Sequence, residues 1–142
     1  MTYYSFEGST DYLAAQPALI ATFKASGSIT AGRGLAFDAG GTSQVYTPTA
    51  IASGSLSCAG LSIESASTGN AVSALVWGFA KNLPAVAGYT PATGDLFQLS
   101  GSAKFTSLTT GSQGSVAAAC AGKVISGSGA GGNFIAFLDC MK

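Results

Sequence analysis

The sequence contains no histidine, and only 8% of its 142 residues are charged, six of them lysine or arginine and six aspartate or glutamate. Enzymes take their proton donors, proton acceptors and nucleophile activators mainly from these residue types. The chain therefore has few of the groups that catalysis requires, and we expect it not to be an enzyme. A protein of this composition is better suited to presenting backbone and small side chains to other proteins.

The net charge is zero, and the basic residues are too widely spaced to form a basic run: Lys24, Arg33, Lys81, Lys104, Lys123 and Lys142. Binding to phosphate backbones requires such a run or patch, so we expect no nucleic-acid partner. No stretch approaches 18 consecutive apolar residues, and we expect no membrane partner. The N-terminal sequence MTYYSFEGSTDY has neither a basic start nor an apolar core, which predicts synthesis and retention in a cytoplasm.

Cys58, Cys120 and Cys140 are widely spaced and odd in number, which favours reduced, buried thiols over a disulfide between two of them. No CxxC pair and no histidine are present to form a zinc site, so we expect no metal. The glycine-rich segments 32–35 and 127–132 lack the Lys-Ser/Thr ending of a phosphate loop, and no helix is expected to follow them. We interpret them as turns and expect no cofactor.

The acidic residues do not indicate a catalytic pair. Glu64 ends an alternating segment, where a solvated side chain is expected. Asp95 follows Gly94 at a predicted turn, where a bond from its side chain to the local backbone is the usual role. A small hydrolase that uses these carboxylates is therefore the least favoured function.

Small residues dominate the chain, since alanine, glycine, serine and threonine make up more than half of it. Short apolar runs are interrupted by glycine, serine, threonine or proline every eight to twelve residues, which is typical of an all-β sandwich or barrel. We predict strands at Gly34–Asp38, Gln44–Thr47, Gly60–Ser65, Val72–Ala80, Asp95–Leu99, Lys104–Leu108, Gly122–Ser126 and Asn133–Asp139.

Three of these segments carry further information. The alternation in residues 61–64 predicts a strand buried on one face, through Leu61 and Ile63. The segments 72–79 and 134–138 are apolar almost throughout, which predicts central strands covered on both faces. Trp77, within the first of them, is expected to be a core or subunit-interface residue.

Residues 1–28 differ from the rest. Pro17 prevents a helix, so we predict an extended arm with at most a short helical turn, followed by a small β-barrel or β-sandwich domain over residues 29–142. An arm with exposed rings either folds back on its own domain or lies on a neighbour, and the second is favoured because the domain core is thin. Its candidate residues for binding a neighbouring protein or subunit are Tyr3, Tyr4, Phe6, Tyr12 and Leu13, and Trp77 completes the candidate set.

The order of several motifs resembles that of the small capsid decoration, or cement, proteins of tailed bacteriophages, of the kind grouped as DUF2190. The similar segments are Ser28–Leu35 (SITAGRGL), Ser67–Gly78 (STGNAVSALVWG), Lys81–Ala85 (KNLPA), Gly94–Phe97 (GDLF) and Ala121–Gly127 (AGKVISG). The resemblance covers about 80% of the chain, and it is carried by the order and spacing of these segments. The Gly127–Asn133 loop and the aromatic arm depart from the family pattern.

The resemblance implies a non-enzymatic β-barrel-like protein that binds the outer surface of an assembled capsid. It also implies attachment to the major capsid protein, commonly as a homotrimer, which would stabilise the shell. The expected location is then the capsid surface of the virion, after synthesis in the host cytoplasm. The alternatives are another phage structural component, of a tail or fibre, and a carbohydrate-binding β-domain, for which Tyr89 near Asn82 would be the exposed aromatic platform.

Overall fold

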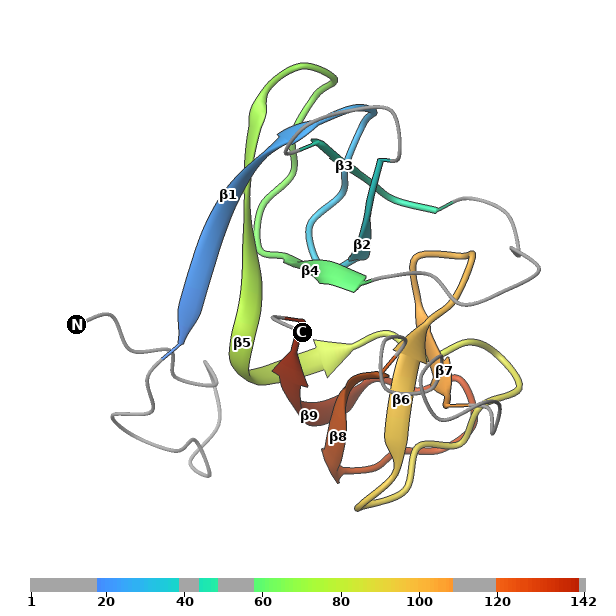
Figure 1. Cartoon of the computed structure of the whole chain (residues 1–142). Helices are drawn as coiled ribbons and strands as arrows, with labels where there is room; N and C mark the ends of the chain where they lie inside the picture. The colour runs from blue at the N-terminus through green and yellow to red at the C-terminus, as the bar shows by residue number, and fades with distance from the viewer. Residues whose placement is uncertain (1–17, 39–43, 49–57, 109–119, 141–142) are drawn as a thin grey trace.

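The computed structural model describes residues 18–38, 44–48, 58–108 and 120–140, which form a β-structure without helices (Figure 1). The strands are β1 (Leu19–Ala25), β2 (Gly34–Phe37), β3 (Gln44–Tyr46), β4 (Cys58–Ser62), β5 (Ala71–Leu83), β6 (Leu96–Leu99), β7 (Phe105–Ser107), β8 (Cys120–Ser126) and β9 (Phe134–Asp139). The predicted all-β class is confirmed. All eight predicted strands are present, with ends that differ by at most three residues.

Strand β1 was not predicted, because its residues were assigned to the extended arm. It is extended, and it pairs antiparallel with β5 from Leu19 opposite Trp77 to Lys24 opposite Ala71. Residues 1–17 of the predicted arm lie outside the described residues. That part includes five of the six candidate binding residues: Tyr3, Tyr4, Phe6, Tyr12 and Leu13.

The first five strands close into a barrel, here called barrel 1, in the order β1-β3-β2-β4-β5 with β1 paired back to β5. It occupies the upper part of Figure 1. Small and branched side chains fill its interior: Ala25, Ile29, Leu35, Val45, Ala59, Val72 and Ala74. A barrel of five strands has a narrow interior, and the alanine-rich composition suits that space.

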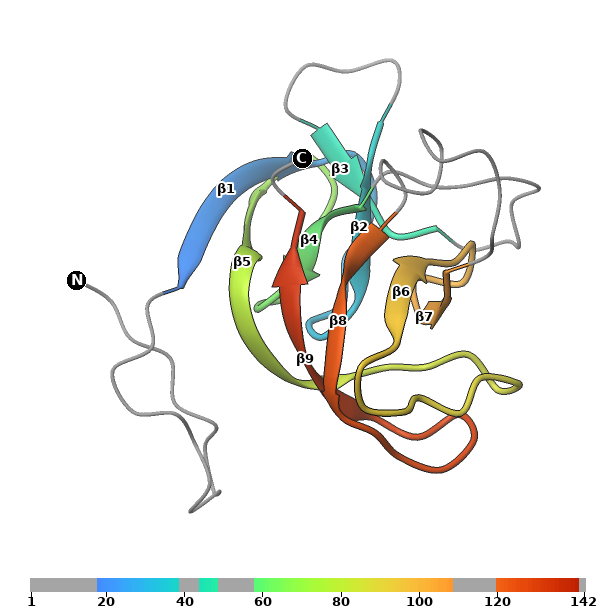
Figure 2. The ribbon, with the colours of Figure 1, turned by 60° about the horizontal axis from the view of Figure 1, so that its bottom comes forward.

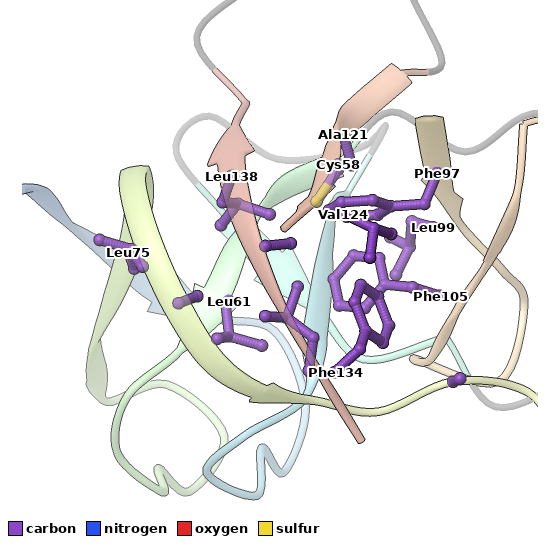
Figure 3. Packing of buried hydrophobic residues seen from close by; sticks show 14 of the residues in the cluster. Cys58, Leu61, Leu75, Phe97, Leu99, Phe105, Ala121, Val124, Phe134 and Leu138 are labelled. Carbon is purple, nitrogen blue, oxygen red and sulfur yellow. The ribbon is translucent and has the colours of Figure 1, made fainter. Parts of the chain in front are cut away.

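Strand β5 continues into a second ring, here called barrel 2, in the order β5-β9-β8-β6-β7. A parallel bridge between Ala85, just after β5, and Phe105 in β7 closes this ring. Its interior holds Phe97, Phe105 and Phe134, whose rings meet edge to face at centroid distances of 5.2–6.4 Å (Figure 3). Edge-to-face contacts add about 0.5–1.5 kcal/mol per pair to the burial of the rings.

The two barrels are structural repeats of one another with an offset of 62 positions, as from Cys58 to Cys120. Leu35 pairs with Gly60, and Phe97 pairs with Gly122. In both barrels the register shifts at the next residue pair, so the β-bulge is repeated as well. The sequence repeats only in part, with Cys-Ala-Gly at 58–60 and again at 120–122.

Hydrogen bonds outside the strand ladders repeat with the same offset. Gly32 N donates to Ser62 O at 2.8 Å, and Gly94 N donates to Val124 O at 2.9 Å. The return bonds are repeated too, from Ser62 N to Arg33 O and from Val124 N to Asp95 O, at 2.9 and 2.8 Å. Equivalent pairings, bulges and turns at one offset show that β2, β4 and their turns in barrel 1 have the same local fold as β6, β8 and their turns in barrel 2.

The expectation of two-sided burial holds for part of β5 and fails for β9. Ala74, Leu75 and Val76 are all buried, but from Trp77 to Lys81 half-buried and buried residues alternate, and β9 alternates along its whole length. The prediction for residues 61–64 is wrong at Ile63, which is 41% exposed. Strand β4 ends at Ser62, which is buried. Its hydroxyl can be buried because it donates to Thr30 O at 2.8 Å and accepts from Arg33 N at 3.0 Å.

The three cysteines are thiols. Two of them lie close together, one at the start of β4 and one directly after β9. Cys58 is buried and Cys140 is half-buried, with 3.1 Å between their Sγ atoms. Oxidation with diamide, a two-electron thiol oxidant, is expected to join this pair, with both thiol hydrogens and both electrons passing to diamide. The disulfide would close the loop from Cys58 to Cys140. Closing a loop of this length adds about 2–4 kcal/mol of stability, which corresponds to a rise of roughly 5–12 °C in the unfolding midpoint.

Thiol titration in denaturant checks this prediction. We expect one titratable thiol after oxidation and three before it. Cys140→Ser should abolish the rise in midpoint, whereas Cys120→Ser should keep it. Three titratable thiols after treatment would contradict the predicted pairing.

Candidate binding surface

Three aromatic side chains lie together on the outer side of barrel 2. Trp77 and Phe79 alternate with buried residues along β5, and Phe137 does so on the neighbouring strand β9. The ring of Phe137 contacts Trp77 at 5.0 Å and Phe79 at 5.1 Å, both edge to face. All three rings are half-buried, so each keeps part of its surface on the outside of the molecule.

Cross-strand pairing extends this cluster sideways over β8 and β6. Phe137 is opposite Lys123, and Lys123 is opposite Leu96, so these side chains point to the same face. Lys123 is exposed, and Leu96 is 48% exposed. We call the set Trp77, Phe79, Leu96, Lys123 and Phe137 the aromatic face. Figure 2 shows its strands β5, β9, β8 and β6 side by side.

The aromatic face adjoins the start of strand β1. Leu19, the first residue of β1, is opposite Trp77 and 44% exposed. The described part of the chain therefore begins at the edge of this face. Of the predicted candidate residues, Trp77 is the one that the structure describes, and it lies on this outer face rather than in either barrel interior.

Glu64 and Asp95 each accept a hydrogen bond from a backbone amide. Glu64 Oε1 accepts from Ser73 N at 2.9 Å, which ties a loop to β5. Asp95 Oδ2 accepts from Ala92 N at 3.1 Å, and this confirms the predicted bond to the turn backbone. No group of three or more Cys, Asp or Glu side chains suited to a metal ion occurs in the described ranges. No helix in the described part of the chain is long and apolar enough to cross a membrane.

Tyr89 is not the exposed aromatic platform that carbohydrate binding would require. It is only 7% exposed, and its ring meets Phe134 edge to face at 6.2 Å. Its hydroxyl donates to Asp95 Oδ2 at 3.4 Å. The residue on which the carbohydrate hypothesis depended is therefore part of the core.

Burial, followed by the charge of Asp95 and the hydrogen bond to it, raises the pKa of Tyr89 to about 12. An unfolded tyrosine has a pKa near 10. Between these values the folded state binds more protons than the unfolded state, so stability falls as the pH rises from about 10 to about 12. Below about pH 10 this contribution is fully present.

We expect the wild type to lose about 1–2 kcal/mol more than Tyr89→Phe over this pH range. Denaturant unfolding followed by circular dichroism at pH 9 to 12 measures the difference. Deprotonation of lysines affects both proteins equally, so the Tyr89→Phe variant is the control for that effect in the wild type. Parallel losses in the two proteins would show that Tyr89 does not titrate in this way.

Comparison with known proteins finds a fold likeness. No family model and no curated protein matches the chain. Among solved structures, the head fiber gp8.5 N base of bacteriophage phi29 is similar, with a TM-score of 0.54 and 12% sequence identity. The likeness covers 89% of this chain and 98% of that one. The chain thus shares its fold, over nearly its whole length, with the base of a phage head fibre.

Proposed function

We propose that this chain is a non-enzymatic structural protein of a tailed-phage virion. In this role it binds the major capsid protein on the outer surface of the shell as a homotrimer and stabilises the shell. The likeness to the phi29 head-fibre base is the single observation that carries the proposal, because it covers nearly all of both chains. The resemblance of the sequence motifs to capsid decoration proteins supports the same location independently.

The distribution of binding groups suits this role. The described surface offers an outward aromatic face, and the first twelve positions of the sequence include four aromatic residues. Aromatic side chains supply much of the binding energy at protein interfaces. In the proposed arrangement the arm binds the capsid, and the aromatic face with Trp77 contacts other copies. A shell offers many identical sites, so a modest affinity per copy is enough to stabilise it.

Sedimentation of the purified protein with undecorated heads of its phage tests the proposal. We expect saturable binding in multiples of three copies, and little change between 0.1 and 1 M salt because few charges are available. Heat release of the packaged DNA should require a higher temperature in decorated heads than in bare ones. Absence of the protein from the head pellet at saturating concentration would reject capsid binding.

A second candidate is an attachment base that carries a fibre, as the name of the phi29 neighbour describes for that protein. In that case the particle surface would show projections longer than the two barrels. Electron microscopy of the heads distinguishes the two, because a decoration protein gives compact knobs and a fibre base gives extended spikes.

A further inference from the structure

The two barrels of the repeat contact each other within the molecule. Leu61 on β4 and Leu75 on β5 are cross-strand partners, and both side chains point outward from barrel 1. They are only 6% and 4% exposed, because they belong to the same buried cluster as the interior of barrel 2 (Figure 3). The β4–β5 side of barrel 1, at Leu61 and Leu75, is therefore covered by barrel 2.

The equivalent side of barrel 2 is not covered in this way. At the offset of 62 positions, Leu61 corresponds to Lys123 and Leu75 corresponds to Phe137. Lys123 and Phe137 are also cross-strand partners. Lys123 is exposed and Phe137 is half-buried. They are at the centre of the aromatic face, so the surface that forms the internal contact in barrel 1 is turned to the outside in barrel 2.

We infer that the aromatic face binds barrel 1 of a second copy of this chain, by repeating between molecules the contact that joins the two barrels within one. The inference rests on the proposed homotrimer and specifies its interface. Such a contact joins different surfaces of the two copies, and head-to-tail contacts of this kind close into rings. Three copies would then form a ring of six barrels of the same fold.

The occupant follows from the repeat itself. Stacked repeats bury a continuous core, and the terminal repeat leaves one face without its neighbour. A second copy supplies that neighbour as a barrel with the same local fold as the barrel that covers Leu61 and Leu75 within the chain. The zero net charge of the chain also means that copies do not repel one another strongly.

Replacing Phe137 by aspartate tests the inference on the full-length protein without capsids. Its ring lies outside the barrel interior, so we expect Phe137→Asp to remain folded by circular dichroism. In sedimentation velocity, the wild type should be a trimer at about 50 μM, and the variant should be a monomer. Thr90→Asp adds the same charge at an exposed residue outside the face and should remain trimeric.

A second variant, designed to strengthen the trimer, tests the inference if Phe137→Asp fails to fold. Lys123→Leu gives barrel 2 the residue that barrel 1 has at the equivalent position. Burial of the leucine side chain is expected to lower the dissociation constant of the trimer by roughly tenfold or more. A monomeric wild type, or a dissociation constant unchanged by Lys123→Leu, would overturn the inference.

Photo-crosslinking identifies the occupant directly. With p-benzoylphenylalanine at position 123 and a mixture of ¹⁵N-labelled and unlabelled protein, we expect crosslinks between copies that end within residues 18–76. Crosslinks to residues 1–17, or to barrel 2 of the other copy, would overturn the head-to-tail contact. Because heads are absent, association of copies without later binding to heads would reject the proposed function and leave this interface standing.

Discussion

Deletion of residues 1–12 is expected to lower the affinity of the protein for phage heads by at least about 100-fold and to leave both barrels folded. The deleted segment contains Tyr3, Tyr4, Phe6 and Tyr12, whereas the first described strand begins at Leu19. An interface aromatic residue is often worth 2 kcal/mol or more, and every 1.4 kcal/mol is tenfold in affinity. Sedimentation with heads measures the loss, and circular dichroism with thermal unfolding confirms the fold.

A matched pair of substitutions separates the rings from the length of the arm. Tyr3→Ala, Tyr4→Ala and Phe6→Ala combined should reproduce most of the loss, whereas Thr2→Ala, Ser5→Ala and Ser9→Ala combined should bind like the wild type. A truncated protein that decorates heads as well as the full chain would show that the arm is not the capsid anchor.

The substitution Gly122→Ala is expected to lower the stability of the protein strongly. Gly122 lies in the bulge of β8, where an added Cβ would overlap the carbonyl oxygen of Phe137 and come within 2.9 Å of the ring of Phe97. Backbone and buried rings on both sides must then move, so we expect a loss of about 4 kcal/mol or more. That loss is a large part of the total stability of a domain and lowers the unfolding midpoint by about 10 °C or more.

The repeat supplies a second test, and an exposed glycine supplies the control. Gly60 is the equivalent of Gly122 in barrel 1, and a Cβ there would come within 2.7 Å of Leu75 O. Gly60→Ala should therefore destabilise the protein in the same manner. A Cβ at Gly88 meets no atom within 4 Å, and Gly88→Ala should change stability by less than about 0.5 kcal/mol. Equal midpoints for Gly122→Ala and Gly88→Ala would contradict the close packing at the bulge.

The sequence predicts the strands well because their ends are marked chemically. Gly32 and Gly94 precede β2 and β6 with positive φ angles of 79° and 92°, and such turns favour glycine. Strand β1 has no comparable signal at its start, since Pro17 and the nearby aromatic residues also fit an extended arm. Its place in the sheet depends on pairing with β5, which is distant in sequence and invisible to local pattern.

The repeat was not predicted, although it leaves a sequence signal. Cys-Ala-Gly recurs at 62 positions, and Gly69 and Gly131 recur at the same offset, each with a positive φ angle. Other equivalent positions differ in kind, such as Leu61 and Lys123. The reason is physical: in barrel 1 this position is covered by barrel 2, whereas in barrel 2 it faces outward, so the two halves have different surroundings.

The candidate surface was predicted in part. Trp77 was selected from its place in an apolar run, but Phe79 and Phe137 were not, because an almost continuous apolar segment does not reveal which of its residues face outward. Only the pairing of Phe79 with Phe137 across β5 and β9 brings these rings together. The polar roles near turns were easier to predict, as for Asp95, because they depend on neighbours in the sequence.

Cryo-electron microscopy of heads with and without this protein tests the central proposal most directly. We predict additional density on the outer surface of the shell only in heads that carry the protein, arranged in groups of three copies, each with two adjacent barrels. Identical outer surfaces in the two preparations, or density confined to the tail, would contradict a capsid-binding function.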